Sequence, residues 1–239
     1  MRRIFVPPDR LCAGELLLDE DEARYVARVL RLGEDIEVEL FDGQGRRARA
    51  TLVQVDKKHV RCEAQPPVDD PAPAGPAVTS LVPLIKGERL DLCLRMLTEL
   101  GVQAVQLVAC ERSVVASSDE GGRLERLQRV VKAAARQCGR GQVPRLDACV
   151  PLREAVARAS GLCLFGDPAA LPGQVVDSET VAGAQLWLCT GPEGGFTEDE
   201  RAALRERQFR PLFLGPHVLR AETAAVAALA VVQQAACPH

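Results

Sequence analysis

The chain has 239 residues, of which 47% are hydrophobic and 26% charged, and its formal net charge is −3. These proportions are typical of a folded globular protein and exclude a largely disordered chain. The net negative charge excludes a protein that coats nucleic acid through its overall charge, but it does not exclude a local basic surface. Aromatic residues make up only 3% of the chain, so base-stacking platforms are not expected.

Neither a membrane span nor an export signal is predicted. The longest apolar run, Ala224 to Val232, is about half of the roughly 20 residues that a transmembrane helix needs. Arg2 and Arg3 are followed by Pro7 and Pro8 before the apolar segment of a secretory signal can form. We therefore expect a cytoplasmic protein that does not bind a membrane.

The cysteines and histidines predict neither disulfides nor a metal site. The nine cysteines are odd in number, scattered, and never spaced as a C-x-x-C pair. The three histidines have no cysteine, histidine or carboxylate partner at the spacing of metal ligands. We expect reduced, mostly buried thiols and no metal.

Short segments of β-sheet character dominate the first part of the chain. Strands are predicted at 36–41, 48–55 and 59–63, with one helix at about 20–30. Five prolines between Gln65 and Ala77 then exclude a helix or a central strand. The sequence thus predicts a small β-barrel domain over 1–68, a proline-rich linker over 66–77, and a second domain over 77–239.

Apolar strands alternate with amphipathic helices in the second domain. A strand at 78–85 precedes a helix at 88–100 and a strand at 102–109, and the alternation continues to the C-terminus. This pattern predicts an α/β fold with a mainly parallel sheet. Ligands of such sheets bind in the loops at the carboxyl ends of the strands.

Three late strands, at 162–165, 185–189 and 212–214, each run into a glycine. A single glycine there is also the ordinary turn from a strand to a helix. The middle loop, GPEGGFT at 191–197, is more specific, and Thr197 with Glu200 should form a capping box for the next helix. Its carboxylates would repel a polyphosphate, and no phosphate-binding glycine motif is present. A ligand without phosphate, including a cationic one, fits this loop better.

The last loop leads into an apolar helix predicted at 224–236. Arg220 and Glu222 frame the start of this helix, and taken alone they would be interpreted as an ion pair or a helix-dipole contact. The helix is apolar on every face until Gln233, so all of its sides should be buried. A subunit interface buries a terminal helix most easily, and we therefore predict a homodimer.

GPEGGFT and LGPHVLRAETAA closely resemble the C-terminal signature of the SPOUT methyltransferases, and of the RsmE family in particular. RVLRLG, FDG, KGER, TELGV, ERS and QCGR also resemble that family and follow its order along nearly the whole chain. One departure is Arg95, which stands near the position where the family has a lysine before TELG.

The resemblance implies the rest of the functional prediction. The second domain would be a SPOUT domain with a C-terminal trefoil knot, and the first a PUA-like, RNA-binding β-barrel. The protein would be a homodimer that uses S-adenosylmethionine to methylate N3 of one uridine in 16S ribosomal RNA of the small subunit. A sulfonium cofactor without phosphate agrees with the acidic middle loop.

The same resemblance assigns candidate site residues. Arg220 is expected to stabilise negative charge on the uracil carbonyl oxygens, with Arg112 and Arg140 as helpers. Glu222 is expected to orient Arg220, and a role as base is the alternative. The cofactor is expected to contact Phe165, Thr190, Gly191, Glu193, Gly194, Gly195, Leu214, Gly215, Val218, Leu219 and Thr223.

Two rows of basic residues are candidates for RNA contact. Helical spacing of three or four places one row in a single stripe: Arg126, Arg129, Lys132, Arg136 and Arg140. A second row consists of Arg24, Arg28 and Arg31 in the first domain. Each row could instead be a solvated helix face paired with nearby acids.

Two other functions stay open from the sequence. One is a SPOUT methyltransferase that acts on another RNA, for example at a ribose 2′-oxygen. The other is a non-catalytic RNA-binding protein of ribosome assembly that has lost the cofactor, which the intact GPEGG and LRAET strings disfavour.

Overall fold

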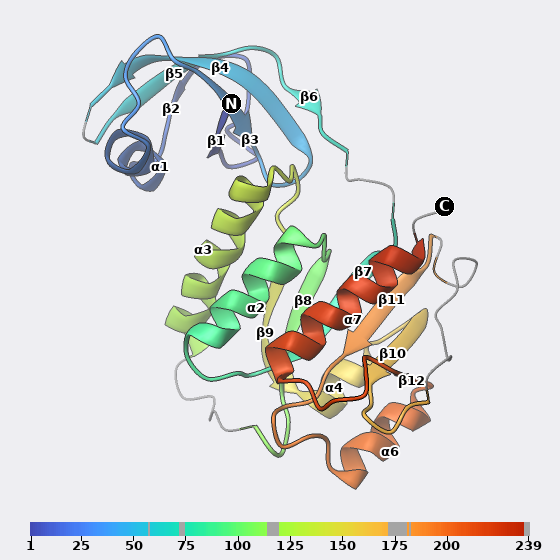
Figure 1. Ribbon diagram of the computed structural model, residues 1–239. Coiled ribbons are helices and arrows are strands. Elements are labelled where there is room, and N and C mark those ends of the chain that lie inside the picture. The colour runs from blue at the N-terminus through green and yellow to red at the C-terminus, as the bar shows by residue number, and fades with distance from the viewer. Residues whose placement is uncertain (57, 72–74, 114–119, 172–180, 182, 237–239) are drawn as a thin grey trace. The chain divides into compact units, whose positions relative to one another are not determined.

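Figure 1 shows the computed structural model, which describes residues 1–56, 58–71, 75–113, 120–171, 181 and 183–236. The chain divides into two compact units, Met1–Pro73 with Ala135–Val143, and Ala74–Ala134 with Pro144–His239. The domain limits 1–68 and 77–239 stay a prediction, and no pattern in the sequence indicated that 135–143 would join the first unit. Among the described residues, no helix is long and apolar enough to cross a membrane.

The first unit is built on a six-stranded sheet with the order β1-β3-β4-β5-β2, in which β6 also pairs with β4. β1 and β3 are parallel, and the other neighbours are antiparallel. The strands predicted at 36–41, 48–55 and 59–63 are confirmed, each within two residues at either end. The bounds are β1 (Arg2–Phe5), β2 (Gly14–Leu17), β3 (Glu37–Phe41), β4 (Arg46–Val55), β5 (Val60–Ala64) and β6 (Val68–Asp69).

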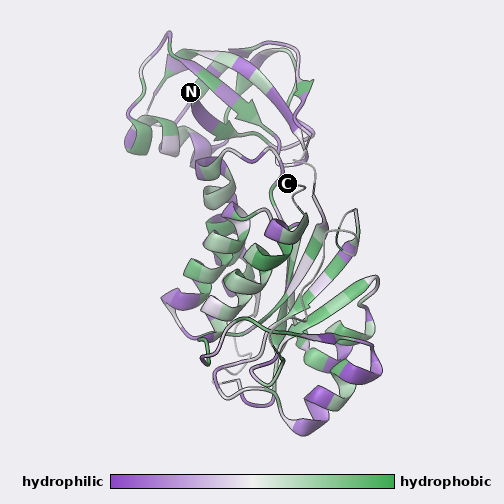
Figure 2. Ribbon diagram, turned by 45° about the vertical axis from the view of Figure 1, so that its right-hand side comes forward, coloured by the Kyte–Doolittle hydropathy of each residue, from purple (hydrophilic) through white to green (hydrophobic). Residues whose placement is uncertain are grey.

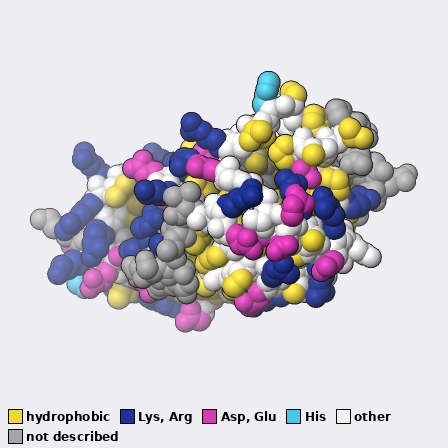
Figure 3. Space-filling view, turned by 90° about the horizontal axis from the view of Figure 1, so that it is seen from below, with side chains coloured by type: hydrophobic (Ala, Val, Ile, Leu, Met, Phe, Trp, Pro, Cys, Tyr) yellow, Lys and Arg dark blue, Asp and Glu magenta, His cyan; other side chains and the backbone are white. Residues whose placement is uncertain are grey.

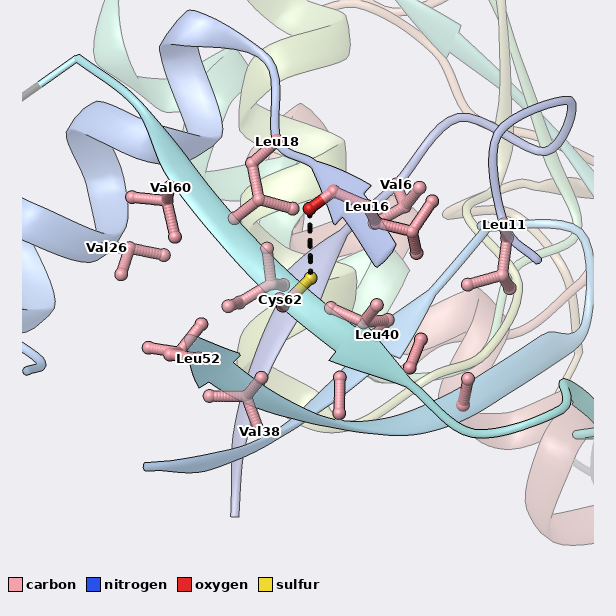
Figure 4. Packing of buried hydrophobic residues seen from close by; sticks show 14 of the residues in the cluster. Val6, Leu11, Leu16, Leu18, Val26, Val38, Leu40, Leu52, Val60 and Cys62 are labelled. Atoms are coloured by element: carbon pink, nitrogen blue, oxygen red, sulfur yellow. Dashed lines mark hydrogen bonds between the residues drawn. The ribbon is translucent and has the colours of Figure 1, made fainter. Parts of the chain in front are cut away.

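Alternating side chains of these strands form the core of the first unit (Figure 4). Val38, Leu40 and Leu52 are fully buried there. Cys62 lies among them, and its Sγ donates to the carbonyl oxygen of Leu16 at 3.7 Å. Burial, with the charge of Glu63 as a smaller cause, raises the pKa of the Cys62 thiol to about 11. Cys62 therefore behaves as a small neutral core residue, as expected for a buried thiol.

The helix predicted at 20–30 is present, but its geometry changes midway. α1 (Glu20–Arg24) begins at the N-cap Asp19, whose side chain accepts a hydrogen bond from the Glu22 amide at 2.8 Å. From Tyr25 to Leu30 the chain is a π-helix, η1, which ends at Arg31 with a positive φ of 53°. π-helical turns occur frequently at functional sites, and the side-chain pattern alone does not distinguish them from α-helix.

The turn between β3 and β4 is organised by a buried carboxylate. Asp42 is 1% exposed, and its Oδ1 accepts hydrogen bonds from the backbone amides of Gln44 at 2.8 Å and Arg46 at 3.0 Å. The Arg46 side chain donates to Oδ2 at 2.9 Å. Burial alone would raise the pKa of Asp42, but these hydrogen bonds and the Arg46 charge outweigh it and lower the pKa.

Substitution of Asp42 should destabilise the first unit. Asp42→Ala leaves two amides and a guanidinium without their acceptor, which should cost about 2–4 kcal/mol of unfolding free energy. Asp42→Asn keeps an oxygen for the two amides and should cost less. Because the folded pKa is lowered, the carboxylate's contribution is present above the ordinary pKa of Asp and is lost as the pH falls through the folded pKa. Urea denaturation of both variants measures these differences, and equal midpoints for Asp42→Ala and the wild type would contradict this role.

The end of helix α3 (Glu120–Cys138) belongs to the first unit. Arg136 pairs with Glu22 at 2.8 Å, and its guanidinium lies 4.0 Å from the centre of the Tyr25 ring. The next residues continue this attachment, since the amide of Val143 donates to the Gly43 carbonyl at 2.8 Å. Arg136 therefore stabilises the fold of this unit.

The second unit has a six-stranded sheet with the order β12-β10-β11-β7-β8-β9, in which every pair is parallel. The predicted α/β fold is thereby confirmed. The adjacent strands β7 and β8, which both lie inside the sheet, are buried almost continuously, as is typical of parallel sheets, and Figure 2 shows the sheet mostly in hydrophobic colours. The strands are β7 (Ala77–Pro83), β8 (Ala104–Ala109), β9 (Arg145–Pro151), β10 (Leu162–Gly166), β11 (Gln185–Cys189) and β12 (Arg210–Leu212).

Helices cover both faces of this sheet (Figure 1). α7 contacts β7, β11 and α2, whereas α4 contacts β8, β9 and α6. α7 begins three residues before the predicted start at Ala224, and it leaves Val231 41% exposed. The chain by itself therefore does not bury every side of the apolar helix, and the homodimer stays a prediction. Besides α3, the helices are α2 (Glu88–Glu99), α4 (Leu152–Ala157), α6 (Glu198–Glu206) and α7 (Ala221–Ala236).

Candidate active site

Three loops at one edge of the parallel sheet line a cavity of about 250 Å³. They leave the carboxyl ends of β10, β11 and β12, which are adjacent in the sheet order. Because the strands are parallel, these loops meet at the same edge, as their glycines had suggested. The cavity is lined by Gly166, Asp167, Pro168, Thr190, Gly191, Pro192, Glu193, Gly194, Gly195, Phe196, Arg201, Leu214, Gly215, His217, Val218, Leu219 and Ala224.

Nine of the eleven residues expected to contact the cofactor line this cavity. The other two are Phe165 and Thr223. Phe165 is 1% exposed and lies beneath the loops, where its ring contacts Phe196 edge to face at a centroid distance of 6.2 Å. Thr223 is an exposed residue of α7, next to Ala224, which does line the cavity.

The sequence interpretation missed Asp167 and Arg201. Asp167 directly follows the glycine that ends β10, and Arg201 lies in α6 beyond the middle loop. Their side chains pair at 2.9 Å, and Asp167 also accepts a hydrogen bond from the Ala169 amide at 3.1 Å. The ion pair therefore joins the first loop to the helix that follows the second. Asp167 could have been found by its position after a strand, whereas its partner lies 34 residues further along the sequence.

The predicted capping box at the start of α6 is confirmed. Glu200 is 3% exposed, and one of its carboxylate oxygens accepts from the Thr197 amide at 2.9 Å. The other oxygen accepts from the Glu111 amide, also at 2.9 Å. This carboxylate holds the end of the middle loop against the chain after β8. Burial, followed by the charge of Glu200, raises the pKa of Cys110 to about 12.

The glycines of the middle loop allow close packing of the backbone. A Cβ atom at Gly191 would lie 3.2 Å from the Phe196 ring, and one at Gly194 would lie 3.0 Å from the Cβ of Arg112. Gly195 has a φ of +70°, which favours glycine. Arg112 donates to the Gly194 carbonyl at 3.0 Å. Arg112, expected to help with catalysis, therefore supports the loop in this structure.

Thr190 presents an unsatisfied polar atom at the cavity. The residue is 1% exposed and lines the cavity, and its buried Oγ1 has no hydrogen-bond partner among the residues that the structure describes. A buried hydroxyl without a partner costs about 1–3 kcal/mol. A ligand in the cavity could supply the missing hydrogen bond.

Arg220 directly precedes α7, and Glu222 lies in the first turn of this helix. Arg220 is exposed, and within the described part of the chain no hydrogen bond or ion pair joins it to Glu222. Glu222 is 6% exposed, and its buried Oε2 has no hydrogen-bond partner in the described ranges of the chain. Burial first, and the Glu222 charge second, raise the pKa of Cys93 on α2 to about 12. Glu222 thus lies near α2, and this geometry does not support an orienting role toward Arg220.

The basic residues of α3 that were expected to contact RNA differ in their exposure and in their ion pairs. On α3, Arg126 pairs with Asp91, whereas Arg129 is exposed and lacks an ion pair among the described residues. Lys132 is half-buried on the same helix. Burial lowers the pKa of Arg140, which belongs with Arg136 to the first unit.

The row in the first domain is more exposed. Arg24 pairs with Glu20 and Asp21 at 3.7 and 3.4 Å, and Arg28 and Arg31 are exposed at η1 and at its end. The face drawn in Figure 3 carries basic and acidic side chains intermixed, with hydrophobic side chains between them. Recognition of an anion on such a surface requires local groups of cations.

The cavity contains a mixture of charges and shows no metal-binding cluster. Glu193 pairs with Arg89 of α2, just as Asp167 pairs with Arg201. Nowhere in the described ranges do three or more His, Cys, Asp or Glu side chains form a group that could hold a metal ion. The described lining therefore offers backbone groups, the Thr190 hydroxyl, His217, and carboxylates that are already paired.

Two family models match the chain. Residues 73–233 match the model described as an RNA methyltransferase domain. Residues 18–65 match the model described as an RNA methyltransferase PUA domain, which confirms the PUA-like prediction for the first unit. The predicted trefoil knot stays a prediction.

Relatives and solved structures cover almost the whole chain. A Mycobacterium tuberculosis protein named ribosomal RNA small subunit methyltransferase E is 34% identical, over 90% of this chain and 85% of the relative. The protein of that name from Synechocystis is 31% identical, over 96% of this chain and 76% of the relative. The Neisseria gonorrhoeae enzyme of that name, solved bound to S-adenosylmethionine, is 30% identical with a TM-score of 0.84, over 98% of this chain and 97% of that one. A Legionella pneumophila protein in complex with the same cofactor has a TM-score of 0.88 at 29% identity, over 98% and 97% of the two chains. The chain therefore belongs to the ribosomal RNA small subunit methyltransferase E family.

Proposed function

We propose that this chain methylates N3 of one uridine in 16S ribosomal RNA of the small subunit, with S-adenosylmethionine as the methyl donor. The observation that carries the proposal is the cavity formed by the three glycine loops, because it belongs to a chain of this family and to a fold solved with that cofactor. The choice of N3 rests on the resemblance of the GPEGG and LRAET loops to the RsmE family.

The residues around the cavity fit this cofactor. S-adenosylmethionine supplies a methyl group activated by a positively charged sulfur and carries no phosphate. The cavity is lined by Gly191, Gly194 and Gly215, which have no side chain to cover their backbone, and by Thr190, whose Oγ1 has no hydrogen-bond partner among the described residues. Asp167 is paired with Arg201 and Glu193 with Arg89, so the described lining offers no unpaired Lys or Arg that would bind a polyphosphate.

Methylation at N3 requires that the base lose a proton and present N3 in line with the methyl group. The protein then has to position the base and stabilise the negative charge that the proton leaves behind. Arg220 is our first candidate for this charge, because it is exposed and directly follows Leu219, which lines the cofactor cavity. Arg28, Arg31 and Arg129 are candidates for contacts with the RNA backbone.

We further propose a cytoplasmic homodimer that acts on the small ribosomal subunit or its RNA. α7 supports the dimer, because Val231 is 41% exposed and Val226, Ala227 and Ala230 are only half-buried within one chain. A second copy could bury this apolar face.

A methyl-transfer assay tests the proposed function. Purified protein, S-adenosylmethionine and either naked 16S RNA or intact small subunits would be incubated, and the nucleosides analysed by mass spectrometry. We expect N3-methyluridine with at least one of the two substrates. Ribose-methylated nucleosides would indicate the alternative SPOUT activity. If calorimetry detected no binding of S-adenosylmethionine, the protein would instead be a non-catalytic RNA-binding protein.

The Asp167–Arg201 ion pair should contribute to cofactor affinity. Arg201→Met removes the cation that holds Asp167 in the first loop, and the unpaired buried carboxylate should then shift the loop. We expect affinity for S-adenosylmethionine to fall about tenfold, equivalent to about 1.4 kcal/mol. Arg205 is an exposed arginine of the same helix, so Arg205→Met is the control. Calorimetry measures the affinity of both variants for the cofactor. Equal cofactor affinity of both variants would refute the contribution.

A further inference from the structure

A second, smaller cavity adjoins the cofactor cavity. Its volume is about 50 Å³, and the two cavities share Pro192 and Glu193 of the middle loop. Leu84, Ile85 and Ala221 supply its apolar walls. The sheet explains this position, because β7 lies next to β11 and the chains leaving both strands therefore run side by side.

Lys86 is the unpaired cation of this smaller cavity. It lines the cavity, its side chain is exposed, and it has no hydrogen bond or ion pair in the part of the chain that the structure describes. Arg89, the other cation there, is already paired with Glu193. Gly87, at φ +69°, then turns the chain into α2.

The other charged groups nearby leave Lys86 available to an anion. The Glu193 carboxylate is neutralised by Arg89, and Glu88 is exposed in the first turn of α2. Glu222 follows the lining residue Ala221 but is itself buried. The cavity thus combines apolar walls with one free positive charge.

We propose that this cavity receives the N3 edge of the target uracil, and that Lys86 stabilises the negative charge on a uracil carbonyl oxygen when N3 loses its proton. The inference rests on the proposed function. N3 must lie within reach of the transferred methyl group, so the base has to enter beside the cofactor cavity, and this cavity shares a wall with it. Its volume suits the edge of a base, and its apolar walls suit the faces of the ring.

The uracil anion carries negative charge on two oxygens, so two cations can stabilise it. Loss of the N3 proton spreads the charge over the flanking oxygens O2 and O4. Lys86 can serve one oxygen and Arg220 the other. Lys86→Met should therefore lower kcat, because a preorganised charge of this kind contributes most in the transition state.

The experiment compares Lys86→Met and Lys86→Arg with the wild type and with Lys58→Met, which removes an exposed lysine of the first unit. Thermal unfolding and S-adenosylmethionine affinity first show that each variant is folded and binds cofactor. We expect Lys86→Met to lower kcat about 10²-fold near neutral pH with KM for RNA close to the wild-type value. Lys86→Arg should keep most of the activity, and Lys58→Met all of it.

A substrate with 5-fluorouridine at the target position gives a second readout. Fluorine withdraws electrons and makes N3 more acidic, so the base ionises with less help from the protein. The deficit of Lys86→Met should therefore shrink on this RNA and as the pH rises. An unchanged kcat, an effect confined to KM as for a phosphate contact, or an equal deficit on both RNAs would overturn the proposal. No methyl transfer by the wild type would instead refute the proposed function itself.

Discussion

Arg220→Ala is expected to lower kcat for methyl transfer by about 10²–10³-fold while leaving affinity for S-adenosylmethionine unchanged. The arginine is exposed and does not line the cofactor cavity, so its removal leaves the walls of that cavity intact. It follows Leu219, the last residue of the third loop at the cavity, and thus stands where a bound base would meet the cofactor. Loss of charge stabilisation in the transition state lowers kcat and kcat/KM together.

Substitution of a second exposed arginine tests whether the effect of Arg220→Ala is specific or follows from any loss of positive charge. Arg205 is exposed in the last turn of α6 and does not line the cavity, so Arg205→Ala should keep wild-type kinetics. Steady-state kinetics measures kcat, and calorimetry on the same preparations measures the affinity for S-adenosylmethionine. If Arg220→Ala retained full methyl transfer with unchanged RNA affinity, the charge role would be wrong.

The sequence was most informative where a local pattern determines a local structure. Thr197 and Glu200 have the spacing of a capping box, and both reciprocal hydrogen bonds are present. Gly166 at the end of β10, Gly191 after β11 and Gly215 after β12 mark the loops of the cofactor cavity, because parallel strands bring their carboxyl ends to one edge. The start of α7 and the bounds of β12 were displaced by two or three residues, since helix and strand ends depend on packing against neighbours.

Features that depend on distant partners could not be predicted from local patterns. Helical spacing placed Arg136 in a basic stripe, but its partners Glu22 and Tyr25 lie more than a hundred residues earlier in the sequence. The Asp167–Arg201 pair and the role of Arg112 in holding Gly194 are of the same kind. Charge periodicity identifies the face of a helix, but the tertiary fold decides which acids lie opposite that face.

Glu222→Gln is expected to stabilise the protein and to impair catalysis. Glu222 is 6% exposed, and its Oε2 has no hydrogen-bond partner among the described residues, so burial of this carboxylate should cost free energy. An amide of the same shape avoids this cost, and the melting temperature should rise by about 2–4 °C, equivalent to about 1 kcal/mol. The same substitution removes the candidate acceptor of the N3 proton, so kcat should fall by about 10²–10⁴-fold. We expect both changes together, since a functional group that is costly to bury is retained for its function.

Glu200→Gln is the control, because the same substitution should have the opposite effect on stability. Both oxygens of Glu200 accept backbone hydrogen bonds, from Glu111 and from Thr197. The amide keeps only one acceptor, so one buried amide donor loses its partner, and stability should fall by about 1–3 kcal/mol. Thermal unfolding therefore compares Glu222, one of whose buried oxygens has no hydrogen-bond partner among the described residues, with Glu200, both of whose oxygens have one. A lower melting temperature for Glu222→Gln would mean that Glu222 has a stabilising partner, and an unchanged kcat would exclude it as the proton acceptor.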